Sequence, residues 1–347
     1  MAIDFFCGVG GMTYGMSKAK VKVIAGIDSD ENCRNAYLRN NKGSQFIHTP
    51  IENLTPSFLK STLGIRKNQD NLLLIGCSPC QFWSKLKTNK KKSEGSAYLL
   101  LEFLRFIEEL RPGWVVVENV PGIVSKKGSI LPRFVEALGD LGYSVTSEVL
   151  DLTKYGVPQT RHRFVLLASR LTTNLKMPNE THAKPISVSA VLGTTNGFPP
   201  VIAGHIDTSP FLHTVSNLSE GNLRRIQITP KNGGMRRNCP SEKNLHVDSY
   251  TLNPKNFSDV YARMSWSKPA PTITTRFNSF SNGRFGHPEE DRAISLREGA
   301  TLQTFPKTYK FFGPLQGIAK QIGNAVPPRI SLLIGKHLTA IYNNLPR

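Results

Sequence analysis

The first half of the chain alternates short apolar segments with segments of helical periodicity, and this alternation is the strongest constraint on the fold. The apolar segments are continuous runs of Val, Ile, Leu and Phe, as in parallel strands buried on both faces. The predicted strands are Ala2–Phe6, Val21–Ile27, Leu72–Ile75, Trp114–Val117, Ser144–Val149 and Phe164–Ala168. The predicted helices between them are Met12–Lys18, Glu31–Asn40, Ala97–Leu110 and Leu131–Leu141. This order predicts a doubly wound α/β sheet with a ligand site at the carboxyl ends of the strands.

The second half of the chain differs in composition and in periodicity. From about residue 171 to residue 317, Pro, Gly, Asn, Ser and Thr dominate and helical periodicity fades. This stretch predicts a loop-rich second domain with short strands. A last helix is predicted at Arg329–Asn343, because two prolines precede it and the first turn of a helix needs no amide donors.

The chain is strongly basic, with a formal net charge of +19 over 347 residues. A basic enzyme usually meets a polyanion, and nucleic acid is the commonest one. Basic pairs at Arg224-Arg225 and Arg236-Arg237 fall in the loop-rich region. A generally basic protein with no polyanionic partner remains open on charge alone.

Apolar content and cysteine use together predict a cytoplasmic protein. No apolar run approaches the roughly 18 residues of a membrane span, and no basic start with a long apolar stretch marks a signal peptide. The five cysteines are scattered through a long chain, which is typical of a reducing compartment and not of a disulfide framework. They are Cys7, Cys33, Cys77, Cys80 and Cys239.

A glycine-rich turn, CGVGG at residues 7–11, joins the first predicted strand to the first helix. Glycines allow a ligand to approach the main chain, and the start of a helix offers unpaired amides. Asp28 ends the second strand about 20 residues on, where a carboxylate can bind ribose hydroxyls. The spacing predicts a nucleoside cofactor, although a tight turn that holds no ligand is equally compatible with it.

The third strand ends in GCSPCQ at residues 76–81, which places Cys80 where an α/β enzyme exposes a nucleophile. A thiol of ordinary pKa is mostly protonated at neutral pH, and nearby positive charge favours the thiolate. Lysines at 85, 87 and 90–92 follow, as expected for a basic loop that tracks a phosphate backbone or for a solvated surface loop. A redox CxxC motif or a zinc site is less well supported, because no second CxxC or paired histidine accompanies it.

Two further segments place charged side chains at strand ends. Glu118 follows the strand Trp114–Val117 and is a candidate acid or hydrogen-bond partner facing the same crevice as Cys80. Alternation predicts that Arg161 and Arg163 share one face of the strand that follows them, where two guanidiniums suit an anion or a base carbonyl. Surface salt bridges would explain the same residues.

Taken together, these segments resemble the cytosine-5 DNA methyltransferase family over nearly the whole chain and in the family's order. DFFCGVGG is similar to the cofactor turn, SPCQ to the nucleophile loop, ENVPG to the acidic motif and VPQTRHR to the arginine motif. RMSWSKPAPTIT resembles the segment that supports the target-recognition domain, while LREGATLQTFP and QIGNAVPP resemble the closing motifs. The resemblance implies a Rossmann-like catalytic domain over 1–172 and 318–347, with a smaller, loop-rich target-recognition domain over 173–317.

The resemblance also implies a role for each matching residue. Cys80 would attack carbon 6 of cytosine, Glu118 would hold or protonate ring nitrogen 3, and Arg163 with Arg161 would bind the ring carbonyl. Asp28 would bind the ribose of S-adenosyl-L-methionine. The other implied cofactor-binding residues are Phe6, Gly8, Gly10, Gly11 and Asn324. No metal is implied.

The implied substrate is double-stranded DNA with the target cytosine flipped out, because its ring face is unreachable inside a duplex. The implied enzyme is a monomeric bacterial or phage modification methyltransferase on the nucleoid, with a cognate restriction endonuclease that it does not bind. The alternatives are a tRNA cytosine-5 methyltransferase and an inactive DNA-binding relative. The long region from about residue 171 to residue 262 favours DNA, because reading duplex sequence needs a dedicated surface.

Four positions depart from the family pattern. Cys77 and Ser78 replace the small or proline residues common before Pro-Cys. Ser29 stands where some members place an aromatic against adenine, and Pro50 stands where an Asp often binds the adenine amine. These departures bear on cofactor affinity and not on the reaction.

Overall fold

The computed structural model describes residues 1–79, 90–235 and 260–346, with side chains from residue 98 onward in the second of these ranges. The chain forms two compact units. Unit 1 comprises Met1–Tyr155, His162–Glu180 and Val326–Arg347. Unit 2 comprises Gly156–Arg161 and Thr181–Ala325. The chain therefore enters unit 2 twice, first for six residues and then for one long segment.

Unit 1 is built on a seven-stranded sheet in the order β3-β2-β1-β4-β5-β8-β6. Its strands are β1 (Ala2–Phe5), β2 (Val23–Asp28), β3 (Gln45–His48), β4 (Leu73–Gly76), β5 (Trp114–Asn119), β6 (Ser144–Asp151) and β8 (His162–Ser169). β3, β2, β1, β4 and β5 pair in parallel. The strand order reverses between β1 and β4, which is where open α/β sheets bind ligands.

Two features of this sheet differ from the sequence-based prediction. β3 was not predicted, because its four residues, QFIH, are too short and mixed to form an apolar run. β8 was expected in a parallel sheet, but it runs antiparallel to both β5 and β6. Its apolar core, Phe164–Ala168, is buried on both faces, and such burial does not encode direction.

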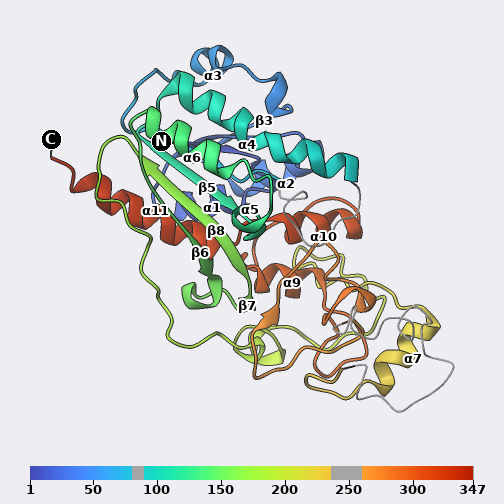
Figure 1. The fold of residues 1–347 in the computed structure, drawn as a ribbon. Coiled ribbons are helices and arrows are strands. Elements are labelled where there is room, and N and C mark those ends of the chain that lie inside the picture. Colours follow the sequence, from blue (N-terminus) through green and yellow to red (C-terminus); the bar gives the residue numbers. More distant parts are fainter. Residues whose placement is uncertain (80–89, 236–259, 347) are drawn as a thin grey trace. The chain divides into compact units, whose positions relative to one another are not determined.

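Helices cover both faces of the sheet (Figure 1). Alternation along β1 sends Ile3 and Phe5 to one face, where the Phe5 ring packs 5.2 Å from that of Phe103. Asp4 points to the other face, toward Thr13. The unit 1 helices are α1 (Gly11–Lys18), α2 (Arg34–Asn40), α3 (Pro56–Leu63), α4 (Lys90–Leu110), α5 (Gly122–Ser125), α6 (Leu131–Asp140) and α11 (Pro328–Asn343). The apolar core contains side chains from α3, α4 and α6 on the Phe5 face.

The α4 helix begins at Lys90, seven residues before the predicted start at Ala97. Three consecutive lysines, Lys90 to Lys92, therefore stand in its first turn, where the helix dipole disfavours positive charge. This unfavourable composition explains why the sequence did not predict the start. The lysines belong to a helix, and not wholly to the basic loop that was expected.

Unit 2 has little regular structure. Its described helices are α7 (Glu220–Ile228), α9 (Leu296–Leu302) and α10 (Leu315–Asn324), and its strands are β7 (Gln159–Thr160) and β9 (Ala270–Pro271). The Ser295 side chain caps α9 in a reciprocal capping box with Glu298. Arg224 and Arg225 lie on α7, whereas Arg236 and Arg237 lie outside the described residues.

The two units divide the chain at 180/181 and 325/326, while the sequence placed the domain boundaries at 172/173 and 317/318. The helix α10 accounts for the second difference. It packs against α9 in unit 2, and a Cβ on Gly323 would lie 2.4 Å from the backbone of Thr274 in the same unit.

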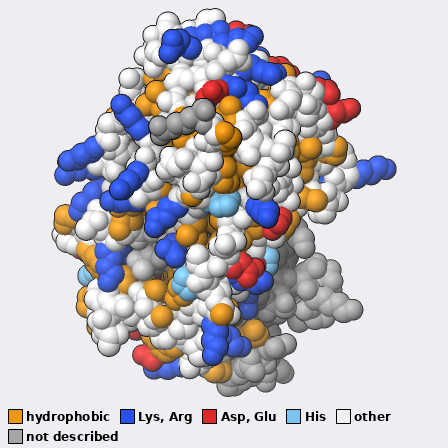
Figure 2. Space-filling view, turned by 90° about the vertical axis from the view of Figure 1, so that its left-hand side faces the viewer, with side chains coloured by type: hydrophobic (Ala, Val, Ile, Leu, Met, Phe, Trp, Pro, Cys, Tyr) orange, Lys and Arg blue, Asp and Glu red, His pale blue; other side chains and the backbone are white. Residues whose placement is uncertain are grey.

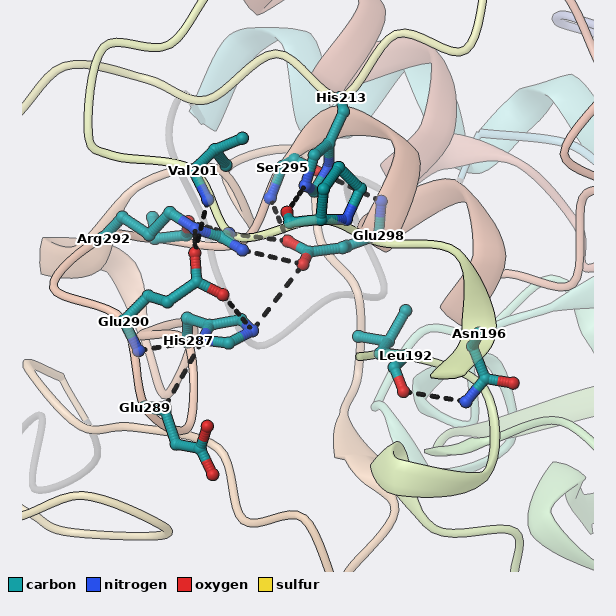
Figure 3. A network of polar contacts seen from close by, with 12 residues as sticks. Leu192, Asn196, Val201, His213, His287, Glu289, Glu290, Arg292, Ser295 and Glu298 are labelled. Atoms are coloured by element: carbon teal, nitrogen blue, oxygen red, sulfur yellow. Dashed lines mark hydrogen bonds and ion pairs between the residues drawn. The ribbon is translucent and has the colours of Figure 1, made fainter. Parts of the chain in front are cut away.

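Buried charges hold unit 2 together (Figure 3). Arg292 and Glu298 form a two-pronged ion pair with N–O distances of 2.8 and 2.9 Å. Burial opposes ionisation of Glu298, but the Arg292 guanidinium lowers the pKa of this carboxyl to about 2. His287 lies 3.3 Å from Glu290 and 3.7 Å from Glu298, and burial lowers its pKa to about 4. At neutral pH the network therefore contains ionised Glu298 and neutral His287.

A buried arginine, Arg263, organises the neighbouring loops. Its guanidinium donates to the carbonyls of Thr229 at 3.1 Å, Ile226 at 2.7 Å and His287 at 3.0 Å. The side chain is 2% exposed. Because loops leave many carbonyls without backbone partners, one planar side chain with five donors can satisfy several of them.

Candidate functional site

The turn after β1 requires unusual backbone conformations. Phe6, Gly8 and Gly10 have φ angles of 61°, 51° and 90°. A Cβ on Gly10 would lie 2.2 Å from Nδ2 of Asn41, so no larger residue fits there. A Cβ on Gly8 would meet no atom within 4 Å, so the turn borders open space at this point. Gly11 then begins α1.

Asp28 ends β2 beside this turn. One carboxylate oxygen accepts from the amide of Gly8 at 2.7 Å, and the other accepts from the amide of Asp30 at 2.8 Å. Two backbone donors thus fix the orientation of a partly exposed carboxylate next to the open space at Gly8. A carboxylate oxygen can accept more than one hydrogen bond, so this geometry suits a diol such as a ribose.

A buried network of polar side chains connects the two elements on either side of the turn, β1 and α1, to α2. The Thr13 hydroxyl donates to Asp4 at 2.6 Å and lies 3.1 Å from the Tyr37 hydroxyl, which lies 2.7 Å from that of Ser44. The second carboxyl oxygen of Asp4 is buried with no hydrogen-bond partner. Burial raises the pKa of Asp4 to about 7, so this carboxyl is only partly ionised at neutral pH.

Glu118 and Arg163 meet at the ends of two paired strands. Glu118 lies in β5 opposite Val165 of the antiparallel β8, so the start of β8 comes to the carboxyl end of β5. Glu118 Oε1 lies 2.9 Å from Arg163 Nε. The direction of approach is poor for a hydrogen bond, so the contact is an ion pair. Both side chains are nearly buried, at 11% and 14% exposed.

The segment that leads to Cys80 is tied to the end of β5. Asn119 Nδ2 donates to the carbonyl of Ser78 at 3.3 Å and contacts its hydroxyl at 3.1 Å. Cys80 itself lies outside the described residues. Burial, with the Asp4 and Glu118 carboxyls, raises the pKa of the Cys77 thiol well above its ordinary value, so Cys77 is a poor nucleophile. Asn119 was not singled out from the sequence, although it is the second letter of the ENVPG motif.

Two predicted site residues belong to unit 2. Arg161 was expected to share a strand face with Arg163, but β8 begins at His162, and Arg161 is 2% exposed. Its guanidinium donates to the carbonyls of Ile273 at 3.0 Å and Ala325 at 3.3 Å. Asn324 is the exposed last residue of α10.

The remaining predicted site residues that the structure describes lie in unit 1, at the end of the sheet where its parallel strands have their carboxyl termini. They are Phe6, Gly8, Gly10, Gly11, Asp28, Glu118 and Arg163. Among the described residues, no cluster of three His, Cys, Asp or Glu side chains has a geometry that could hold a metal ion. Over the same residues, no helix has both the length and the apolar content that a bilayer crossing requires.

Solved structures share this fold. A prophage-encoded protein of Escherichia coli, assigned as a DNA modification methyltransferase, superposes with a TM-score of 0.77 at 20% identity, covering 99% of both chains. The Dnmt2 methyltransferase of S. pombe superposes with a TM-score of 0.62 at 15% identity, covering 98% of both chains. At these identities the likeness concerns the fold.

Sequence relatives specify the family. The type II methylase M.HgiDII of Herpetosiphon aurantiacus is 39% identical over 99% of this chain and 96% of its own length. The type II methyltransferase M1.BsuMI of Bacillus subtilis is 30% identical over 96% of this chain and 79% of its own length. The pattern of the C-5 cytosine-specific DNA methylases matches residues 1–340. The chain therefore belongs to the C-5 cytosine-specific DNA methylase family and is an enzyme, a DNA (cytosine-5) methyltransferase.

Proposed function

We propose that the chain is the modification enzyme of a type II restriction–modification system and methylates a flipped cytosine within a specific duplex sequence. The observation that carries the proposal is the buried Glu118–Arg163 pair, 2.9 Å apart, beside the Asn119 tether to Ser78. A carboxyl group and a guanidinium thus meet where β5 ends and β8 begins, and Asn119, next to Glu118, contacts Ser78, which precedes Cys80 by two residues. The type II relatives support the biological setting.

The proposed chemistry begins with the Cys80 thiolate. It attacks carbon 6 of cytosine, an S–C bond forms, and the electron pair of the 5,6 double bond moves into the ring. Glu118 acts here in its protonated form and delivers its proton to ring nitrogen 3, while the Arg163 guanidinium stabilises the ring carbonyl. Carbon 5 becomes nucleophilic and takes the methyl group, with S-adenosyl-L-homocysteine as the leaving group. A base then removes the carbon-5 proton, the 5,6 double bond re-forms, Cys80 leaves as the thiolate, and ring nitrogen 3 returns its proton to Glu118.

The proposed cofactor, S-adenosyl-L-methionine, supplies an electrophilic methyl group, in keeping with the family. The residues present fit it, because Gly8 borders open space and Asp28 is held by two amides. Asp28 would bind the ribose hydroxyls, while Phe6, Gly10 and Gly11 shape the turn against the cofactor. The resemblance also assigns Asn324 to cofactor binding, and this assignment stays a prediction.

We further propose that unit 2 carries the recognition of the DNA sequence. Lys and Arg side chains are spread over the face drawn in Figure 2 and are more numerous there than Asp and Glu. Such a surface attracts the phosphate backbone of any sequence, so it positions the duplex without reading it. Base reading requires further side chains that reach into a groove.

The decisive experiment compares wild-type protein with Cys80→Ala on duplex DNA and on tRNA, using radiolabelled cofactor. Only the wild type should methylate duplex DNA, whereas both proteins should bind it, because binding does not depend on the thiolate. A duplex with 5-fluorocytosine at the target should trap a covalent adduct on Cys80. Methylation by Cys80→Ala, an adduct on Cys77, or labelling of tRNA alone would each overturn the proposal.

A further inference from the structure

Two isoleucines of unit 2 are the most exposed of the large apolar side chains that the structure describes. Ile202 is 79% exposed and Ile206 is 74% exposed. They lie four residues apart on one loop, residues 199–216, which we call the isoleucine loop. Single exposed apolar residues are common on protein surfaces, but two on the same short loop form a small apolar tip.

The backbone of the isoleucine loop is braced from within. The amide of Gly204 donates to the Ser216 carbonyl at 3.3 Å, and the amide of Val215 donates to the His205 carbonyl at 2.9 Å. The Asp207 carboxylate accepts from the amides of Ser209 at 2.8 Å and His213 at 2.7 Å. These bonds fix the chain on both sides of the tip, so little conformational entropy is left to lose when the tip contacts a partner.

The base of the loop is anchored in the buried charge network of unit 2 (Figure 3). The amide of Val201 donates to Glu290 at 2.8 Å. The ring of His213 lies 2.8 Å from the Ser295 hydroxyl through one nitrogen and 3.0 Å from the Pro199 carbonyl through the other. The exposed isoleucines are thus joined to unit 2 by polar contacts, of which the His213–Ser295 contact is buried.

Size and charge decide between the partners that could cover this tip. Two side chains offer far less area than the roughly 800 Å² per partner of a stable protein interface, which disfavours a second copy of the chain. A DNA groove accepts apolar side chains one or two at a time, against thymine methyl groups or between base steps. The net charge of +19 brings this polyanion to the protein surface.

We propose that the isoleucine loop is a base-reading element, in which Ile202 and Ile206 make apolar contacts with bases in a groove of the duplex. This inference rests on the proposed function, in which unit 2 recognises the sequence. Apolar contacts depend on which bases are present, whereas phosphate contacts do not. The isoleucines therefore contribute to affinity for the specific sequence and not to general DNA binding.

The test uses the full chain with S-adenosylhomocysteine and two duplexes, one carrying the site found by bisulfite sequencing and one scrambled. The variant is the double substitution Ile202→Ala with Ile206→Ala. Its affinity for the specific duplex should fall at least about tenfold, because two apolar side chains lose their burial. Its affinity for the scrambled duplex should change less than about twofold. Both residues are exposed, so the midpoint of thermal unfolding should not move.

A matched control is Phe58→Ala, which removes an exposed apolar side chain, 46% exposed, from unit 1. This control should bind both duplexes as the wild type does. Unchanged specific affinity in the isoleucine variant, or equal losses on both duplexes, would overturn the inference. A wild-type dimer in sedimentation that the variant abolishes would assign the tip to a second copy instead. Failure of the wild type to methylate DNA would overturn the proposed function.

Discussion

The two units satisfy their backbone in different ways. In unit 1 the carbonyls and amides pair within a seven-stranded sheet, and the candidate site stands where those strands end. In unit 2 there is little sheet, and buried side chains such as Arg263 and Gln159 do the pairing. Regular structure leaves charged side chains available for chemistry, whereas loops use them as structural donors.

This difference changes the meaning of the basic charge. Arg161, Arg263, Arg292 and Arg297 are each at most 2% exposed, and their guanidiniums bond to protein groups within unit 2. Burial lowers the pKa of Arg297 to about 10, which still leaves it charged at neutral pH. Four of the cations in the net charge therefore stabilise the fold and are not exposed to a phosphate backbone.

The largest expected effect lies in unit 1, at Glu118. Glu118→Gln keeps the size of the side chain but cannot deliver a proton to the cytosine ring. Methyl transfer should slow by about 10² to 10⁴ fold. The affinity for S-adenosylhomocysteine, measured by calorimetry, should change by less than about tenfold. A large loss of cofactor affinity with unchanged turnover would instead place Glu118 in the cofactor pocket.

In unit 2, replacement of a buried charged side chain should lower the stability of the fold, whereas Glu118→Gln in unit 1 slows the reaction. Arg263→Met removes a buried donor from four carbonyls and from the Asp291 carboxylate. The free energy of unfolding should fall by about 3–5 kcal/mol in a urea titration. Arg224→Met, on the exposed face of α7, serves as the control and should lower it by less than about 0.5 kcal/mol. Equal losses of unfolding free energy in both variants would contradict the structural role of the buried arginine in unit 2.

Two titrating groups should give the units opposite responses to pH. The pKa of Asp4 is raised from 3.8 to about 7, so between these values the folded chain keeps a proton that the unfolded chain loses. Stability from this group falls as pH rises, by about 1.4 kcal/mol per pH unit. The pKa of His287 is lowered from 6.5 to about 4, so its contribution is lost as pH falls through that range.

Urea titrations of Asp4→Asn and His287→Asn at several pH values would separate the two responses. Relative to the wild type, Asp4→Asn should gain stability as pH rises from 4 to 7, since it lacks the carboxyl that resists ionisation. His287→Asn should gain relative stability as pH falls from 6.5 to 4. Parallel curves for either variant and the wild type would contradict the assignment of that group.

The smallest effect is expected at the tether between β5 and the segment before Cys80. Asn119→Ala removes both contacts with Ser78, and methyl transfer should fall by about tenfold while DNA and cofactor affinities hold. Ser78→Ala keeps the carbonyl contact and loses only the hydroxyl, so it should retain more activity. If Ser78→Ala is the more damaged variant, the hydroxyl has a role that the tether does not explain.

The sequence predicted unit 1 better than unit 2 for a physical reason. Strand periodicity and glycine turns are local signals, and they located six of the seven strands and the turn at residues 7–11. The direction of β8 and the pairing of Asn119 with Ser78 depend on contacts between distant segments. The same limit applied to Arg161, where local alternation suggested a site residue but distant carbonyls of Ile273 and Ala325 engage the side chain.

The double entry of the chain into unit 2 has a consequence for exchanging specificity between relatives. A single contiguous cassette, 181–325, could be transplanted by two crossovers, as recombination between homologous genes would do. However, the hexapeptide 156–161 pairs with that cassette through β7 and β9 and through Arg161. A chimera that takes both segments from one relative keeps the native contacts between them. A chimera that takes 181–325 alone must form the β7–β9 pairing and the Arg161 contacts between segments from two different proteins. The transferable module in this enzyme therefore consists of two segments, and one of them is only six residues long.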